Sequence, residues 1–270
     1  IDADGYMPRI KSTVDPNRIV VYTMNRHQDQ LCLYAVNPRT TVAQLLIKES
    51  VPKYVQESAV EAIKFVGNNI ILPSDRSGFM NLYIYNMNGQ LQRTIGGKFD
   101  ITEVYGYDAK TGDVYYQAAA LAPTDRQVYV NHKNGKTERL TDAEGWNSAL
   151  FSGDYQYFIN TWSDYNTPYV YTTRTRAGKV ISTLQDNSQL RQTIKEYGFC
   201  KREAFSFTTS EGVTLNGWML RPLDFDASKR YPVIMHQYSG PGSQQVKNAW
   251  SAGSMGQGGA YDSYLVQQGF

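Results

Sequence analysis

The chain has 270 residues, 41% of them hydrophobic and 19% charged, which suffices for one large domain or two ordinary ones with apolar cores. The formal net charge is only +2 at pH 7, and the 27 basic and 25 acidic residues are scattered, so charge favours neither a nucleic acid nor a membrane surface as partner. No run of about 18 apolar residues is present, and residues 1–10 lack the basic and apolar regions of a signal peptide. If the protein is exported, its signal is expected upstream of Ile1.

The sequence gives little support for metal or redox chemistry. Cys32 and Cys200 lie far apart, and neither belongs to a CxxC or CxxH pattern, so both are interpreted as free, packed thiols. The three histidines show no metal-ligand spacing: His27 and His132 are interpreted as surface polar residues of the blades, and His236 has no acidic residue at a motif spacing. We therefore expect no bound metal and no cofactor.

A repeated strand pattern dominates residues 6–186. The 21 tyrosines, 22 glycines and 10 prolines favour β structure interrupted by turns. Four segments share an alternating aromatic or aliphatic core followed by a polar turn: QLCLYAVN, MNLYIYNM, RQVYVNHK and TPYVYTTR. Aligning them on Leu33, Tyr83, Val128 and Val170 gives steps of roughly 42 to 50 residues, the length of a four-stranded propeller blade.

Each repeat divides into four short strands, separated by turn sequences such as MNGQ, KTGD, KNGK and RAGK. The four units cover residues 6–50, 61–97, 101–142 and 146–186. We therefore predict a mainly β fold in which residues 1–186 form four four-stranded blades of a β-propeller. An irregular β-sandwich is the alternative, since its strands also recur roughly every 8 to 12 residues, but it does not require the whole four-strand unit to repeat.

The pattern changes at Asn187. Residues 187–201 are predicted to form a linker helix, with Leu190, Ile194 and Tyr197 on its apolar face and Asn187 or Ser188 as its N-cap. The next elements are a hairpin at 202–222 that turns at residues 210–212, a strand at 232–237, a glycine-rich loop and a helix at 260–270. Residues 202–270 are thus expected to be the first part of an α/β domain, and the chain ends before such a domain could close its core.

Tyr238 is the candidate site residue. It follows the predicted strand at 232–237 and precedes the glycine-rich loop, and ligands of open α/β sheets bind outside such strand ends. A tyrosine phenol is protonated at neutral pH and could donate a hydrogen bond to the oxyanion that develops when an acyl carbonyl is attacked. The alternative is a tyrosine that packs at a domain interface. No GxSxG nucleophile elbow is present, and Ser254, in GSMGQGG, is interpreted as part of a flexible linker.

The stretch GWMLRPLDFDASKRYPVIMHQYSGPGSQ, residues 217–244, resembles the start of the catalytic domain in the prolyl oligopeptidase clan of serine peptidases. More narrowly, it resembles the dipeptidyl peptidase IV family, in which a strand ends in Tyr, followed by a small residue, Gly and Pro, and often by Ser and Gln. The matching residues are Tyr238, Ser239, Gly240, Pro241, Ser243 and Gln244. The segments YMPRI, MNRHQDQLCLY and SDRSGFMNLYIYN resemble propeller blades of the same family, so the resemblance covers nearly the whole chain.

The resemblance implies an eight-bladed propeller that caps an α/β-hydrolase domain, with the active site in the cavity between them. It implies a serine exopeptidase that releases dipeptides with Pro or Ala at the second position from peptides with a free N-terminus, through a Ser, Asp and His triad. The family's tyrosine in this loop helps form the oxyanion hole, and the resemblance implies the same role for Tyr238. The triad and the family's paired glutamates have no counterpart here, so they are expected after Phe270 and before Ile1, respectively.

The chain is accordingly expected to be an internal segment without peptidase activity of its own. Homodimerisation and export to the periplasm or cell surface are expectations taken from the family alone. One alternative is a non-catalytic propeller that serves as a binding module; another, within the enzymes, is a related prolyl oligopeptidase or acylaminoacyl peptidase. The isolated chain is expected to associate or to be marginally stable, because an unclosed ring of blades exposes strand edges and sheet faces.

Overall fold

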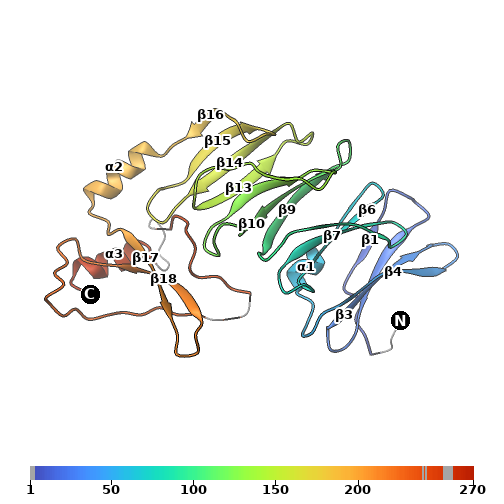
Figure 1. Cartoon of the computed structure of the whole chain (residues 1–270), viewed down its shortest axis with the longest axis horizontal. Coiled ribbons are helices and arrows are strands. Elements are labelled where there is room, and N and C mark those ends of the chain that lie inside the picture. The colour runs from blue at the N-terminus through green and yellow to red at the C-terminus, as the bar shows by residue number, and fades with distance from the viewer. Residues whose placement is uncertain (1–3, 239, 241, 252–257) are drawn as a thin grey trace. The chain divides into compact units, whose positions relative to one another are not determined.

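Four-stranded sheets contain most of the strands in the computed structural model, which describes residues 4–238, 240, 242–251 and 258–270. In each of these sheets the strands are hydrogen-bonded in chain order, from the first strand to the fourth, as in a propeller blade. The sheets follow one another along the chain (Figure 1). The predicted mainly β fold, with four blades over residues 6–186, is confirmed.

The strand bounds agree closely with the sequence repeats. The first sheet contains β1 (Ile10–Ser12), β2 (Ile19–Met24), β3 (Gln30–Val36) and β4 (Ala43–Ser50); the second contains β5 (Lys64–Val66), β6 (Asn69–Ser74), β7 (Asn81–Asn86) and β8 (Leu91–Ile95). The third contains β9 (Ile101–Asp108), β10 (Asp113–Ala118), β11 (Gln127–Asn131) and β12 (Thr137–Arg139); the fourth contains β13 (Trp146–Phe151), β14 (Tyr157–Ser163), β15 (Val170–Thr175) and β16 (Val180–Gln185). The chain divides into two compact units, Ile1–Ala118 with Val130–Glu138 and Ala119–Tyr129 with Arg139–Phe270.

The ladder between the third and fourth strands carries the same irregularity in three sheets. The register shifts lie between Leu33 and Tyr34 in β3, between Ile84 and Tyr85 in β7, and between Tyr171 and Thr172 in β15. Each shift falls within two residues of the position on which the sequence repeats align. Because a bulge bends a strand and increases its twist, the repeated sequence also repeats a backbone geometry.

The first two sheets share one apolar core. Val20 and Tyr22 of β2 lie on the same side of their sheet as Leu33 of β3, and Ile70 and Leu72 of β6 join them in the same cluster. All five side chains are essentially inaccessible to solvent. Burying one such side chain typically stabilises the folded state by about 1.5–3 kcal/mol, so this cluster is the main source of stability in the first unit.

Two glycine turns allow a close approach between neighbouring segments. Gly89, in the turn between β7 and β8, has φ 78°, and a Cβ there would lie 2.0 Å from the carbonyl oxygen of Leu46 in β4. Gly178, in the turn between β15 and β16, has φ 84°, and a Cβ there would lie 2.3 Å from the carbonyl oxygen of Leu140. Both positions therefore require glycine for the backbone angle and for the space.

The helix α1 (Glu57–Glu61) was not expected from the sequence. It is only five residues long, too short to show a helical period, and it buries Ala59 and Val60 in the first unit. A short apolar pair of this kind is compatible with a loop, a strand or a helix, and its tertiary contacts decide between them.

The predicted linker helix is present as α2 (Ser188–Glu196), but its start differs from the expectation. Asn187 precedes the helix with φ 53°, and neither Asn187 nor Ser188 caps it through a side chain. Instead the Ser188 backbone N–H donates to Oδ1 of Asp186 at 3.0 Å. No side chain of α2 is buried, so its predicted apolar face is uncovered among the described residues.

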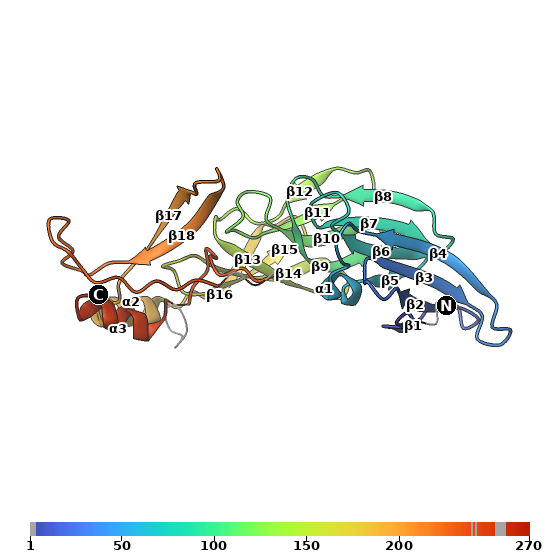
Figure 2. The same cartoon turned by 90° about the horizontal axis from the view of Figure 1, so that it is seen from below.

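The segment after α2 contains the predicted hairpin and the last helix. β17 (Arg202–Thr208) and β18 (Thr214–Leu220) pair in an antiparallel register, with Gly212 at φ 78° in the turn between them (Figure 2). α3 (Ala260–Gln267) lies within the predicted helix at 260–270. The boundaries proposed at residues 186 and 201 stay predictions, although α2 and the hairpin begin where those boundaries place them.

The predicted strand at 232–237 is wrong for this structure, which has no strand there. Val233 and Met235 are 85% and 80% exposed, and no strand among the described residues pairs with this segment. A strand needs hydrogen-bonded neighbours as well as an apolar sequence, so the pattern alone was not sufficient.

Candidate functional site

Tyr238 lies at the end of the unpaired segment, and 61% of its surface is exposed. Its ring is folded back over Gly240, where a Cβ would lie 2.7 Å from the phenol oxygen of Tyr238. The chain then turns, because the Ser243 N–H donates to the carbonyl oxygen of Gly240 at 3.1 Å and Gly242 has φ 72°. The Tyr238 phenol is thus exposed to solvent just before a tight turn.

Two other residues of the motif, Ser239 and Pro241, lie outside the described residues, as does Ser254. The described part of this loop and its continuation comprises Tyr238, Gly240 and residues 242–251.

The histidines do not form a triad with the residues described here. His236 Nε2 lies 3.9 Å from Oδ1 of Asp262 in the first turn of α3. His132 follows β11, with Nδ1 3.2 Å from Oδ1 of Asp113 and Nε2 3.6 Å from a carboxylate oxygen of Glu138. No serine or cysteine nucleophile accompanies either histidine in these contacts.

The loop that carries Tyr238 continues into a segment that is bound to the turns of the third and fourth sheets. Gln244 Nε2 donates to the carbonyl oxygen of Pro123 at 2.7 Å, and Arg126 donates to Oε1 of Gln244. The Arg126 guanidinium in turn lies 4.4 Å from the ring centroid of Trp146. Gln244 thus connects this segment to the connection between β10 and β11.

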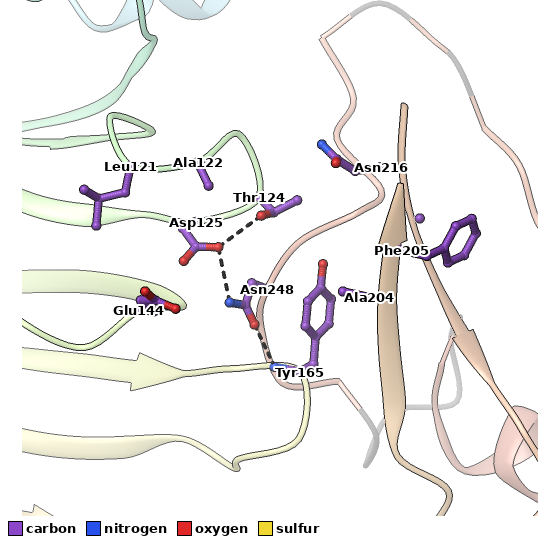
Figure 3. A pocket seen from close by; sticks show the side chains of 11 residues that line it. Leu121, Ala122, Thr124, Asp125, Glu144, Tyr165, Ala204, Phe205, Asn216 and Asn248 are labelled. Atoms are coloured by element: carbon purple, nitrogen blue, oxygen red, sulfur yellow. Dashed lines mark hydrogen bonds between the residues drawn. The ribbon is translucent and has the colours of Figure 1, made fainter. Parts of the chain in front are cut away.

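Asn248 makes three hydrogen bonds to the same turns. Its backbone N–H donates to the carbonyl oxygen of Thr124 at 2.9 Å, and its side-chain Nδ2 donates to Oδ1 of Asp125 at 3.2 Å. Its Oδ1 accepts from the backbone N–H of Tyr165 at 3.0 Å. Figure 3 shows these side-chain contacts on one side of a pocket. Asn248 is therefore held from two separate connections, the one after β10 and the one after β14.

The pocket in Figure 3 has a volume of about 290 Å³ and lies within the second unit. Asp125, Tyr165 and Asn248 line it together with Ala204 and Asn216 of the hairpin. Its lining mixes carboxylate, amide and phenol groups with apolar carbon. Tyr238 does not line it, so the pocket and the predicted donor are separate features of this structure.

Asp125 is the charged centre of this region. It is only 7% exposed; its Oδ2 accepts from the Gly145 N–H at 2.8 Å, and its Oδ1 accepts from the Thr124 hydroxyl at 3.0 Å as well as from Asn248. Burial, reinforced by the negative charge of Asp125, raises the pKa of the Tyr165 phenol. Tyr165 therefore stays protonated through the neutral and mildly alkaline range.

Arg202, the first residue of β17, joins the hairpin to the same region. Its backbone N–H donates to Oδ1 of Asn166 at 2.9 Å, and its guanidinium lies 4.5 Å from the ring centroid of Trp218. The same guanidinium donates to the hydroxyl of Ser251. Burial lowers the pKa of Arg202, although this side chain keeps its charge at any physiological pH.

Metal and membrane sites find no support in the described part of the chain. No group of three His, Cys, Asp or Glu side chains there is placed to hold a metal ion. No helix among the described residues is long and apolar enough to cross a membrane. Cys32 and Cys200 are both free, and burial raises the pKa of the Cys200 thiol.

Sequence reasoning singled out Tyr238, whose role stays a prediction, and did not point to Asp125, Tyr165 or Asn248. No motif could have linked these three, because they lie in different connections and meet only in the folded chain. The one usable signal was Gln244, which closes the Tyr-Gly-Pro motif and proves to bind a turn of the propeller sheets.

Comparisons with known proteins agree with this architecture. A family model described as "Dipeptidyl peptidase IV (DPP IV) N-terminal region" matches residues 1–169. Dipeptidyl peptidase 4 of Arthroderma otae and that of Trichophyton equinum are each 31% identical over 185 residues, which is 66% of this chain and 24% of those proteins. The crystal structure of Porphyromonas gingivalis dipeptidyl peptidase 4 is similar over 100% of this chain, with 38% identity and a TM-score of 0.92. The chain spans about a quarter of the two curated relatives and 38% of the solved chain.

Proposed function

Because the chain belongs to the dipeptidyl peptidase IV family, we propose that it is part of a serine exopeptidase that releases dipeptides from peptides with a free N-terminus. Pro or Ala is the proposed residue at the second position. The observation that carries the proposal is the similarity to a solved dipeptidyl peptidase 4 over the whole chain, including the segment around Tyr238. Export and homodimerisation are proposed on the same family grounds.

The proposed role of Tyr238 is to donate a hydrogen bond to the oxyanion. When a nucleophile attacks the scissile carbonyl, negative charge develops on the carbonyl oxygen, and a neutral phenol donor stabilises that charge without giving up its proton. The exposure of Tyr238 and its place beside the glycine turn support this role, because the phenol can approach a bound peptide. The nucleophile, its base and the orienting carboxylate are proposed to come from residues beyond this chain.

The test is Tyr238→Phe in the full-length protein, assayed with a chromogenic Pro-containing dipeptidyl substrate. Losing one oxyanion donor is expected to lower kcat by about 10² or more, with little change in KM, because the interaction forms only in the transition state. Tyr197→Phe is the matched control, since that phenol is 72% exposed at the end of α2. An unchanged kcat in Tyr238→Phe would leave Tyr238 with a packing role only.

Two further measurements separate the alternatives. The full-length protein should cleave the substrate with a free N-terminus and not its N-acetylated form; the reverse preference would indicate an acylaminoacyl peptidase. No turnover of either form, with intact folding, would favour a non-catalytic binding module. The 270-residue chain alone should show no turnover, because its sequence contains no GxSxG nucleophile elbow; activity of this chain would contradict the proposal.

A further inference from the structure

The pocket of Figure 3 is built from separate stretches of the second unit. Its lining residues come from the connection between β10 and β11, from the residues just before β13 and just after β14, from both strands of the hairpin, and from Asn248. Its volume of about 290 Å³ lies close to the lower limit of small-molecule sites, roughly 300 Å³. Since one molecule of liquid water takes up about 30 Å³, a ligand of about ten non-hydrogen atoms is the size that this pocket suits.

The side chains that line the pocket are negatively charged or neutral. The two carboxylates are those of Asp125 and Glu144, and none of the lining residues is a lysine, an arginine or a histidine. Neither carboxylate forms an ion pair with another residue that the structure describes. Because a buried carboxylate without a cation is unfavourable, a ligand that brings a positive charge gains an electrostatic partner here.

Asp125 retains one position for a further hydrogen bond. The side chain is 7% exposed, and its three hydrogen-bond donors are all neutral. The Thr124 hydroxyl and the Asn248 amide donate to Oδ1, whereas Oδ2 accepts only from the Gly145 N–H. A carboxylate has about four acceptor positions, so one remains on Oδ2. A ligand that carries N–H donors can take this position.

Tyr165 adds an aromatic ring and a second acceptor to the lining. Its hydroxyl has no hydrogen-bond partner among the described residues. Burial raises the pKa of this phenol, and the charge of Asp125 raises it further, against a smaller opposite effect of Arg202. The nearest cation therefore does not cancel the negative charge at the ring, and the face of a tyrosine ring itself attracts cations.

We propose that this pocket binds a small organic cation through a guanidinium or ammonium group that pairs with the carboxylates of Asp125 and Glu144. A guanidinium is the better match, because it is planar, carries several N–H donors and stacks on aromatic rings. One N–H bonds to the remaining position on Asp125, and the charge is shared with Glu144. Tyr238 does not line the pocket, so the proposal is independent of the peptidase activity proposed above.

The first experiment compares two probes of nearly the same shape, butylguanidinium and the neutral butylurea, by isothermal titration calorimetry with the full-length protein. Butylguanidinium is expected to bind with a Kd of about 1 mM or lower, which is reasonable for so small a ligand. Butylurea should bind at least about tenfold more weakly, because it lacks the charge that the carboxylates attract. Equal affinity for the two probes, or no binding of butylguanidinium, would overturn the proposal.

The second experiment locates the site with three variants. Glu144→Gln removes one charge from the lining and should raise the Kd for butylguanidinium by about threefold or more. Ala204→Phe fills the pocket without changing its charge and should abolish measurable binding, in a protein that melts like the wild type. Glu211→Gln, at an exposed position in the hairpin turn, is the matched control and should keep the wild-type Kd. Wild-type affinity in either Glu144→Gln or Ala204→Phe would overturn the proposal.

The third experiment identifies the source of the cation. The peptide acetyl-Gly-Arg-Gly-amide presents the same guanidinium on a side chain, and its blocked N-terminus keeps it from being a substrate of the proposed exopeptidase. Binding of butylguanidinium without the peptide would assign the pocket to a free cation, and similar Kd values for both would assign it to arginine side chains. Both results support the proposal, whereas binding of neither probe contradicts it.

Discussion

The blades and the segment after α2 contain similar apolar sequences with opposite outcomes. β7 pairs with β6 on one side and β8 on the other, and its first five residues are buried. Residues 232–237 carry an equally apolar run but remain unpaired, with Val233 and Met235 mostly exposed. The difference lies in the availability of hydrogen-bonded neighbours and not in the strand propensity of either sequence.

Charged side chains show a contrast between a buried pair in the blades and an exposed pair in the hairpin. In the blades, Glu49 and Arg76 form an ion pair at 2.5 Å with the carboxylate almost fully buried. In the hairpin, Arg221 and Glu203 pair at the surface. The Glu49–Arg76 pair is thus buried within a blade, whereas the Arg221–Glu203 pair of the hairpin is exposed. Three pairs of matched substitutions in the 270-residue chain test this comparison. Peptide-resolved hydrogen exchange gives the opening free energy of each region separately.

The largest difference in opening free energy is expected between two substitutions of apolar residues, one buried and one exposed. Ile70→Ala removes a fully buried side chain from the core shared by the first two sheets and should lower the opening free energy of those sheets by about 2–5 kcal/mol. Val233→Ala, at an exposed position, should change it by less than about 0.5 kcal/mol. A comparable loss for Val233→Ala would show that residues 232–237 are packed in solution.

The two arginine substitutions are expected to differ slightly less in their loss of opening free energy. Arg76→Ala leaves the Glu49 carboxylate buried without its cation, which should cost about 3 kcal/mol at pH 7. Arg221→Ala removes an exposed partner of Glu203 and should have no measurable effect. Equal effects of the two substitutions would remove the distinction between the blades and the hairpin.

The loss in Arg76→Ala should also depend on pH. Burial raises the pKa of Glu49 above its ordinary value of 4.5, opposed by the hydrogen bond from Ser74 and the charge of Arg76. A carboxyl whose pKa is higher in the folded state contributes stability below pH 4.5 that is lost as the pH rises through the folded pKa. Arg76→Ala removes an influence that lowers this pKa, so its deficit should grow from acidic to neutral pH. A deficit independent of pH would contradict this account.

The smallest difference in opening free energy is expected between two asparagine substitutions, one buried and one exposed. Asn147 is inaccessible; its Nδ2 donates to the carbonyl oxygens of Arg126 at 3.1 Å and Ala143 at 3.0 Å, and its Oδ1 accepts from Asn160 at 3.1 Å. Asn147→Ala should cost about 1–3 kcal/mol, because these groups lose a buried partner. Asn216→Ala, on the exposed hairpin, should stay within about 0.5 kcal/mol of the wild type. A neutral Asn147→Ala would show that water replaces the amide.

The sequence by itself determined the four blades, because a unit of four short strands repeats along the chain and most of its turns carry a glycine or an asparagine. It also determined that Tyr238 ends an apolar run before a glycine turn. These features depend on neighbours in the chain, so a repeated pattern is sufficient to predict them.

Only the tertiary structure decided the remaining features. Gly89 and Gly178 were recognisable as turn residues, but their close approach to Leu46 and Leu140 depends on a neighbouring sheet. The run at 232–237 met the sequence criteria for a strand and lacked a partner. Asp125, Tyr165 and Asn248 carry no common motif, since their hydrogen bonds join parts of the chain far apart in sequence. Strand pairing and hydrogen bonds between residues far apart in sequence depend on how the folded chain packs. A local sequence pattern therefore does not predict them.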